Sequence, residues 1–151
     1  MTGREENQYL ASAVTGIVLA FDFGVRRIGV AVGNTETRHA EPLSTIDACD
    51  SSRRFAAISA LIADWEPSLL VVGLPFSVDG SEHEMTVRSR RFANQLRGRF
   101  GLPVATVDER FTSADADVRL RDAGANWKQR KKRVDAVAAE LILRDYLDAH
   151  T

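Results

Sequence analysis

Three acidic residues stand at positions where a hydrophobic core has no use for a charge. Asp22 follows five apolar residues, Glu109 lies just past Val107, and Asp135 lies within the apolar beginning of a helical pattern. Carboxylate oxygens are hard ligands that suit Mg²⁺ or Mn²⁺, and such ions activate water and hold a scissile phosphate. These residue types therefore suggest a metal-assisted phosphodiester hydrolysis, with Asp22, Glu109 and Asp135 as catalytic residues and metal ligands.

Each of the three acids also has a purely structural interpretation. Asp22 before Gly24 fits a turn residue that shapes a hairpin. Glu109, flanked by two other charged residues, fits a solvated charge cluster, and Asp135 fits an acid favoured by a helix dipole. Taken singly, none of the three would be assigned to catalysis. Taken together, at the ends of predicted strands, they favour a shared site.

The apolar pattern predicts the elements that must position these acids. Strand-like runs cover residues 16–22, 28–33, 43–46, 69–73 and 104–107, and helical spacing covers residues 51–66, 81–100, 113–121 and 133–149, with Ser51 or Ser52 as the first N-cap and Pro67 as its stop. The first two strands should pair as an antiparallel hairpin, and the later strands should run parallel through right-handed crossovers. This order predicts an α/β fold, a ribonuclease H-like mixed sheet with an antiparallel hairpin start and helices on both faces.

The predicted fold also explains how the acids would meet. In open α/β sheets, functional groups gather outside the carboxyl ends of central strands, where Asp22 and Glu109 would emerge. Asp135 shares its helix face with Ala139 and Ile142, so its charge needs compensation. If this helix packs with its N-terminus over the same rim, three carboxylates converge and would repel one another without a cation.

Length and charge limit the function classes. With 151 residues, 44% of them apolar, the chain can close one substantial core. We expect a single domain over residues 14–151, preceded by a disordered arm at 1–13. Twenty Lys and Arg against 21 Asp and Glu give a net charge of −1, so any affinity for nucleic acid must come from local patches.

The cysteine content and the apolar runs favour a cytoplasmic protein. The sole cysteine, Cys49, excludes an internal disulfide and a thiolate-rich metal cluster, and this fits a reducing environment. An intermolecular bridge through Cys49 stays open. The apolar run at residues 14–21 is too short for a membrane span and lacks a basic signal-peptide front. We expect a cytoplasmic protein without membrane association.

Several short motifs follow one another in an order that resembles a known family. They are Asp22-Phe23-Gly24 with residues 27–31, Gly73-Leu74-Pro75, Asp79-Gly80, residues 108–113, and Val134-Asp135 ahead of Ala138-Ala139. Over roughly residues 16–148 the chain resembles the YqgF/RuvX family of pre-16S rRNA nucleases, which are similar to RuvC-type Holliday junction resolvases. Two residues depart from the family pattern. Asn34 stands where the family often has an acid, and Ala136 stands where a small hydroxyl residue often follows the last catalytic Asp. The groups that would surround the metal ligands therefore differ from the family's.

The resemblance implies a nuclease that matures the 5′ end of 16S ribosomal RNA, with the three acids at the family's catalytic positions. It implies pre-rRNA and the ribosome as partners, while four-way DNA junctions are the alternative substrate. Cutting a junction in pairs would require a two-fold dimer, and the sequence leaves monomer and homodimer open.

Basic residues close to the acids are the predicted substrate contacts. Five of the six residues from Lys128 to Arg133 are basic, and we expect them to form a cationic loop beside the metals. A solvated charge run is the alternative. The predicted nucleic-acid contacts are Arg110, Thr112, Lys128, Arg130, Lys131 and Lys132. The arginines of the 81–100 helix flank both edges of its apolar stripe and form no single basic face.

Two other functions compete with a nuclease. An actin-like phosphotransferase or ATPase would also use an Asp-x-Gly hairpin, but such enzymes need two lobes and a second phosphate loop. A non-catalytic nucleic-acid or ribosome-assembly factor would keep the fold without turnover. The presence of all three acids argues against this loss of catalysis.

Overall fold

The structure, a computed structural model, describes residues 15–47, 50–109 and 127–150, and for residues 127–133 it describes the backbone alone. In chain order the elements are β1 (Ile17–Phe23), β2 (Arg27–Asn34), β3 (His39–Asp47), α2 (Ser51–Trp65), β4 (Leu69–Pro75), α3 (Glu84–Phe100), β5 (Val104–Glu109) and α5 (Trp127–Ala149). The predicted arm at 1–13, the predicted helix at 113–121 and Cys49 lie outside the described residues. Among the described helices, none has the length and apolar character needed to cross a membrane.

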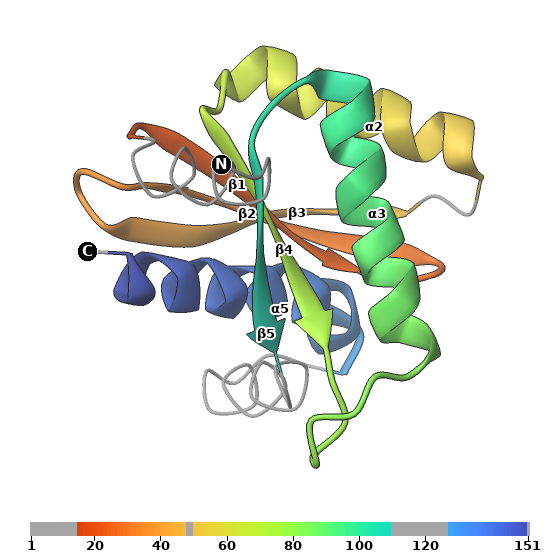
Figure 1. The fold of residues 1–151 in the computed structure, drawn as a ribbon. Coiled ribbons are helices and arrows are strands. Elements are labelled where there is room, and N and C mark those ends of the chain that lie inside the picture. Colours follow the sequence, from red (N-terminus) through yellow and green to blue (C-terminus); the bar gives the residue numbers. More distant parts are fainter. Residues whose placement is uncertain (1–14, 48–49, 110–126, 151) are drawn as a thin grey trace.

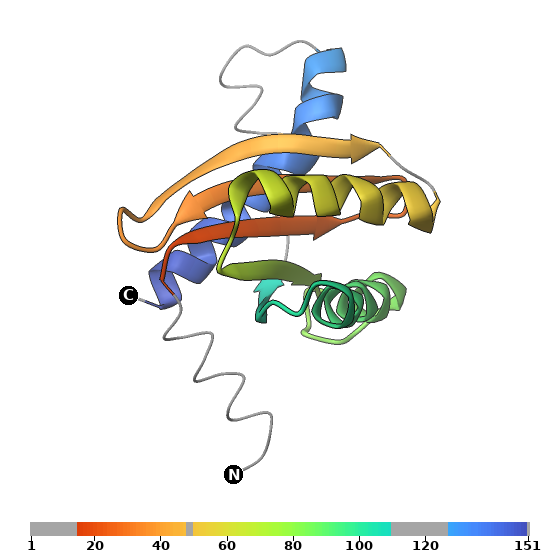
Figure 2. The same cartoon turned by 90° about the horizontal axis from the view of Figure 1, so that it is seen from above.

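The strands form one mixed sheet in the order β3-β2-β1-β4-β5. β1 pairs antiparallel with β2, and β2 with β3, whereas β1 with β4 and β4 with β5 are parallel. Helix α5 covers one face of the sheet, and α2 and α3 cover the other (Figures 1 and 2). The predicted α/β class, with its antiparallel hairpin start and helices on both faces, is confirmed. The third strand is longer than the predicted 43–46.

An aromatic cluster joins the sheet to α2 and α3. The ring of Phe92 on α3 lies 5.9 Å from Phe21, 4.8 Å from Phe23 and 6.2 Å from Phe55, measured between centroids. Such pairs add to the stabilisation from burial alone. The end of β1 is therefore held on this face by large rings.

On the opposite face of the sheet, three glycines lie where α5 approaches closely. A Cβ added at Gly29 would lie 1.8 Å from the backbone oxygen of Asp135. One added at Gly33 would lie 2.8 Å from Leu143, and one at Gly73 would lie 2.4 Å from Ile142. We call Gly29, Gly33 and Gly73 the glycine floor. It fixes how deeply α5 sits on the sheet.

Three helix boundaries differ from the prediction. The N-cap of α2 is Asp50 rather than Ser51 or Ser52, because the Asp50 carboxylate accepts from the backbone N–H of Arg53 at 2.9 Å. Helix α3 begins at Glu84 rather than at residue 81, because His83 and Thr86 form a capping box.

Helix α5 begins at Trp127 rather than near residue 133, so the predicted cationic loop at Lys128–Arg133 is wrong. These residues form the first turns of the helix. Lys, Gln and Arg are good helix formers, but they carry no apolar period. The apolar pattern from Val134 onward therefore marked only the packed part of α5.

Substitution of Gly29 tests the close approach of α5. Gly29→Ala should destabilise the protein by about 3 kcal/mol, the upper end of overpacking costs, because its Cβ meets helix backbone. Gly98→Ala is the matched control, since no described atom lies within 4 Å of a Cβ there and alanine favours the helix. Urea unfolding of both variants measures the difference. Equal stabilities for the two variants would contradict the described packing.

Candidate active site

Strand alternation places two of the predicted acids on the face covered by α5. On β1, Val18 and Ala20 pack in the core beneath α5, so Asp22 is the next side chain on that face. On β5, Val107 packs against the same core, and Glu109 follows it in the alternation. Both acids lie at the carboxyl ends of parallel strands, as predicted, but only β1 is a central strand, and β5 lies at the edge of the sheet.

The glycine floor brings the third acid to Asp22. Asp22 is paired with Gly29 in the β1–β2 ladder. The backbone of Asp135 lies directly against Gly29, where a side chain would otherwise stand. Asp135 is thereby close enough for its negative charge to raise the pKa of Asp22. The structure thus brings together two acids that are far apart in the sequence.

Burial controls the protonation of Asp22. Desolvation, followed by repulsion from Asp135, raises the pKa of Asp22 from 3.8 to about 7. In the absence of a cation, this carboxyl is therefore about half protonated at neutral pH. A strongly shifted acid at the rim of a sheet is typical of a functional site.

Arg27 is a site residue that the sequence analysis missed. Its Nε donates to Asp135 Oδ2 at 2.9 Å. Burial raises the pKa of Asp135, while the charge and hydrogen bond of Arg27 lower it. The turn before Arg27 is tight, because a Cβ at Gly24 would lie 2.6 Å from the Arg27 carbonyl oxygen. The only sequence signal was the position of Arg27 within the hairpin motif.

Glu109 lies on β5, two strands from Asp22 with β4 between them. Its side chain is nearly buried, and a Cβ at Gly73 would lie 3.4 Å from its Cγ. In the part of the chain that the structure describes, no three His, Cys, Asp or Glu residues gather closely enough to hold a metal. The structure therefore pairs Asp22 with Asp135 and places Glu109 on the same face, without closing the predicted three-acid cluster.

The all-oxygen donor set suits a hard divalent cation. Two carboxylates that repel each other, one of them with a pKa of about 7, would be stabilised by a positive charge between them. Asp22 and Asp135 thus fit Mg²⁺ or Mn²⁺ in chemistry. Glu109 supplies a further oxygen donor on the same face.

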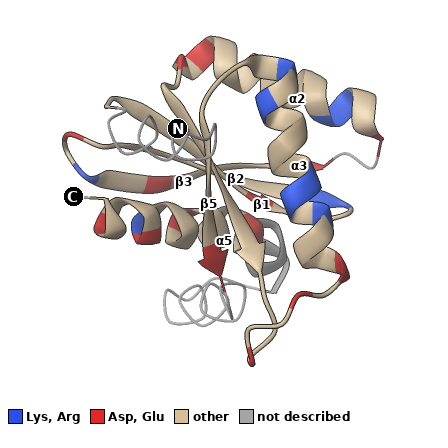
Figure 3. Cartoon of the chain, in the orientation of Figure 1, with Lys and Arg blue, Asp and Glu red and all other residues tan. Residues whose placement is uncertain are grey.

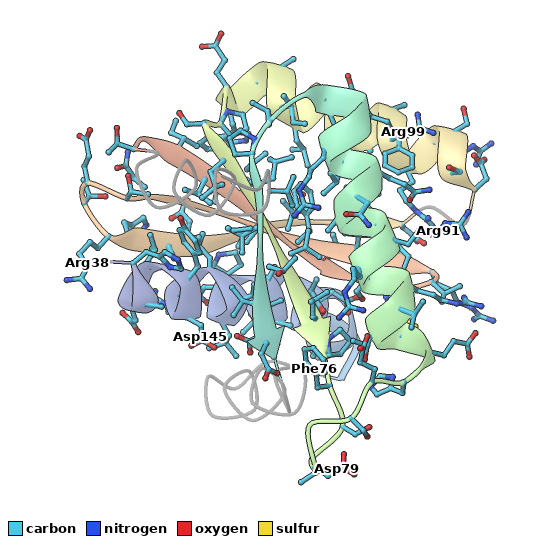
Figure 4. The ribbon with its side chains drawn as sticks, viewed as in Figure 1. Arg38, Phe76, Asp79, Arg91, Arg99 and Asp145 are labelled. Carbon is cyan, nitrogen blue, oxygen red and sulfur yellow. The ribbon has the colours of Figure 1, made fainter. Side chains whose placement is uncertain are left out.

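The loop after β4 borders this end of the sheet and extends past the ends of β4 and β5 (Figures 1 and 4). Asp79 Oδ1 accepts from both the backbone N–H and the hydroxyl of Ser81, at 2.9 and 2.6 Å. Ser77 N–H donates to the Ser81 carbonyl at 2.9 Å, and the Thr86 hydroxyl donates to the Pro75 carbonyl. The predicted turn at Asp79-Gly80 is confirmed.

The predicted nucleic-acid contacts are not placed by the structure. Arg110 and Thr112 lie outside the described residues. The backbone of Lys128, Arg130, Lys131 and Lys132 lies in the first turns of α5, ahead of Asp135 in the same helix. Their contact with a substrate stays a prediction.

Comparison with known sequences identifies a family. The profile of the RuvX family, described as "Holliday junction resolvase", matches residues 16–149. A protein of Burkholderia lata is 50% identical over 138 residues, covering 91% of this chain and 93% of its own length, and is named "Putative pre-16S rRNA nuclease". One of Dechloromonas aromatica with the same name is 53% identical over 134 residues, covering 89% and 92%.

Solved structures share the fold. RuvC of T. thermophilus, in complex with a Holliday junction substrate, matches with a TM-score of 0.56 and 16% identity over 88% of this chain and 94% of that one. The Fowlpox virus resolvase bound to Holliday junction DNA gives a TM-score of 0.52 and 8% identity over 88% and 97%. The ribonuclease H-like fold predicted from the sequence is confirmed by this likeness to RuvC.

The raised pKa of Asp22 predicts a specific pH dependence of stability. In EDTA, the folded protein keeps the Asp22 proton up to about pH 7, whereas the unfolded chain loses it near 3.8. Wild type should therefore lose stability relative to Asp22→Asn as the pH rises through this interval, and the difference should level off above it. Urea unfolding at a series of pH values measures this difference. A constant difference would show that Asp22 titrates normally.

Removal of Arg27 should raise the pKa of Asp135 further, because both of its effects on that carboxyl lower the pKa. Carboxyl-carbon NMR titration of Arg27→Met in EDTA measures the change. Arg26→Met is the control, since the neighbouring arginine removes the same charge without a hydrogen bond to Asp135. Equal effects of the two variants would exclude a specific role for the Arg27 contact.

Proposed function

The chain belongs to the RuvX family, and from this premise we propose that it is a metal-dependent endonuclease that hydrolyses phosphodiester bonds of nucleic acid. The observation that supports this proposal best is the Asp22–Asp135 pair, with the pKa of Asp22 near 7. A bound cation would offset the cost of placing Asp135 beside the buried Asp22.

Asp22 and Asp135, with Glu109 beside them, would hold Mg²⁺ or Mn²⁺. When bound, the metal activates water and stabilises the leaving oxygen of an in-line displacement. The chain's own residues prepare the site. The glycine floor fixes the backbone of Asp135, and Arg27 orients its carboxylate. Burial around Asp22 removes water that would weaken electrostatic interactions with a phosphate.

We propose 5′-end maturation of 16S pre-rRNA as the reaction, because the relatives at about 50% identity carry that name. The ribosome is then a partner, and bacterial rRNA processing places the protein in the cytoplasm. Residues 14–151 would act as a single nuclease domain. The predicted contacts Arg110, Thr112, Lys128, Arg130, Lys131 and Lys132 would hold the substrate backbone.

Holliday junction resolution is the second candidate, favoured by the description of the family profile. The same acids and metals would serve either reaction. A four-way junction is cut in pairs by a two-fold dimer, whereas trimming of an RNA end can be performed by a monomer. A non-catalytic assembly factor would leave the Asp22–Asp135 pair without a purpose.

Cleavage assays with Asp22→Asn test the proposal. The wild-type chain should cleave a labelled 16S precursor with Mg²⁺ or Mn²⁺ and not in EDTA, and Asp22→Asn and Asp135→Asn should each lose at least about 100-fold. Asp145→Asn is the matched control, an exposed acid of α5 on the outside of the molecule (Figure 4). A four-way DNA junction should be assayed in parallel.

The outcomes separate the candidates. Cleavage of the junction alone would favour resolution over rRNA maturation. Cleavage of neither substrate, or cleavage that Asp22→Asn leaves intact, would overturn the nuclease mechanism.

A further inference from the structure

Helix α3 carries five arginines in two different environments. Arg88 pairs with Glu84 at 2.7 Å, Arg90 pairs with Glu82, and Arg97 donates to Asn94 and to the Val104 carbonyl oxygen. Arg91 and Arg99 lie on the side of α3 that faces α2 (Figure 4). Neither forms an ion pair with an acid among the described residues. As predicted, α3 alone presents no single basic face.

Two arginines outside α3, Arg54 and Arg26, also form no ion pair with an acid among the described residues. Arg54 on α2 lies with its guanidinium carbon 5.2 Å from the centre of the Phe23 ring, and one of its terminal nitrogens donates to the Val25 carbonyl oxygen at 3.4 Å. Its Nε is buried and has no hydrogen-bond partner among the residues that the structure describes. Arg26, next to Val25 at the tip of the β1–β2 hairpin, is exposed. The nearby Asp50 is already engaged by Arg53 at 3.5 Å.

The aromatic cluster connects these positions. Arg99 lies 4.0 Å above the Phe55 ring, and Arg54 lies over Phe23. Both rings stack on Phe92, whose neighbour in the chain is Arg91. We call Arg26, Arg54, Arg91 and Arg99 the arginine face. Rings beneath two of the guanidinium groups hold them in place at low entropic cost.

Among the described residues, no carboxylate forms an ion pair with a member of the arginine face. Arginines gather on α2 and α3, with acids near the ends of these helices, and acids also mark the end of β5 and the outside of α5 (Figure 3). Fixed guanidinium groups suit phosphate oxygens, which they contact through paired N–H donors. The hairpin links this face to the acids, since Arg26 precedes Arg27, the partner of Asp135.

We propose that the arginine face binds the phosphate backbone of a base-paired arm of the substrate, away from the scissile bond. This inference rests on the proposed nuclease function and adds to it a second binding surface on the opposite side of the sheet. An arm that passes the hairpin tip would contact both surfaces. Duplex RNA and duplex DNA share this chemistry, because both carry a negatively charged phosphodiester backbone.

Binding without turnover tests the proposal. The full chain in EDTA is titrated against a fluorescent stem-loop RNA and a fluorescent DNA duplex of equal length, at several salt concentrations. The double variant Arg91→Met/Arg99→Met should bind at least about 10-fold more weakly at low salt, and its salt slope should fall by about two, one per lost phosphate contact. The salt slope of Arg54→Met should fall by about one.

The matched control is Arg88→Met/Arg90→Met, which removes the same charge from the same helix at positions already paired with acids. Its affinity and its salt slope should be close to those of the wild-type chain. Equal losses for the two double variants, or no loss for either, would overturn the proposal. Absence of duplex binding by the wild-type chain would also overturn it and would favour an acidic protein partner.

Cleavage of a short single-stranded substrate separates this inference from the proposed function. The arginine variants should cleave it at the wild-type rate, because it does not reach the arginine face. No cleavage by the wild-type chain would count against the nuclease, whereas wild-type cleavage with unchanged duplex binding in the variants would count against the arginine face alone.

Discussion

The contact between α5 and the backbone of Gly29 is the constraint on which the candidate site depends. The carbonyl of Asp135 occupies space that any side chain at Gly29 would fill. Gly29 is the ladder partner of Asp22, so this backbone contact brings Asp135 close enough for its charge to act on Asp22. Burial is the main cause of the raised pKa of Asp22, and this contact adds the repulsion from Asp135 and brings Asp135 to Arg27.

The sheet separates two kinds of surface. The α5 face holds the glycine floor and carries the acids, whereas the α2–α3 face contains aromatic rings that support arginines. The β1–β2 hairpin belongs to both, because Phe23 packs on Phe92 and Arg27 contacts Asp135. A nucleic acid bound across the hairpin would meet positive charge on one side and the hydrolytic groups on the other.

The strands and the position of Asp22 were predictable from the sequence, because buried strands form continuous apolar runs and an acid at the end of such a run is conspicuous. The start of α5 was not predictable, because the Lys and Arg residues there favour a helix but show no helical spacing of apolar residues. Arg27 was missed for another reason. Its role arises from a hydrogen bond to a residue 108 positions away, and local patterns hold no record of such a contact. The contacts of Arg99 and Arg54 with aromatic rings likewise depend on tertiary packing.

Paramagnetic Mn²⁺ binding followed by NMR tests the central claim most directly, because it locates a cation without requiring a substrate. If the Asp22–Asp135 pair is the cation site, Mn²⁺ should broaden the amide signals of Gly29 and Asp135 and leave that of Gly98 sharp. The broadening should disappear in Asp22→Asn/Asp135→Asn. Unbroadened signals at Gly29 and Asp135, or broadening that persists in the double variant, would contradict the account.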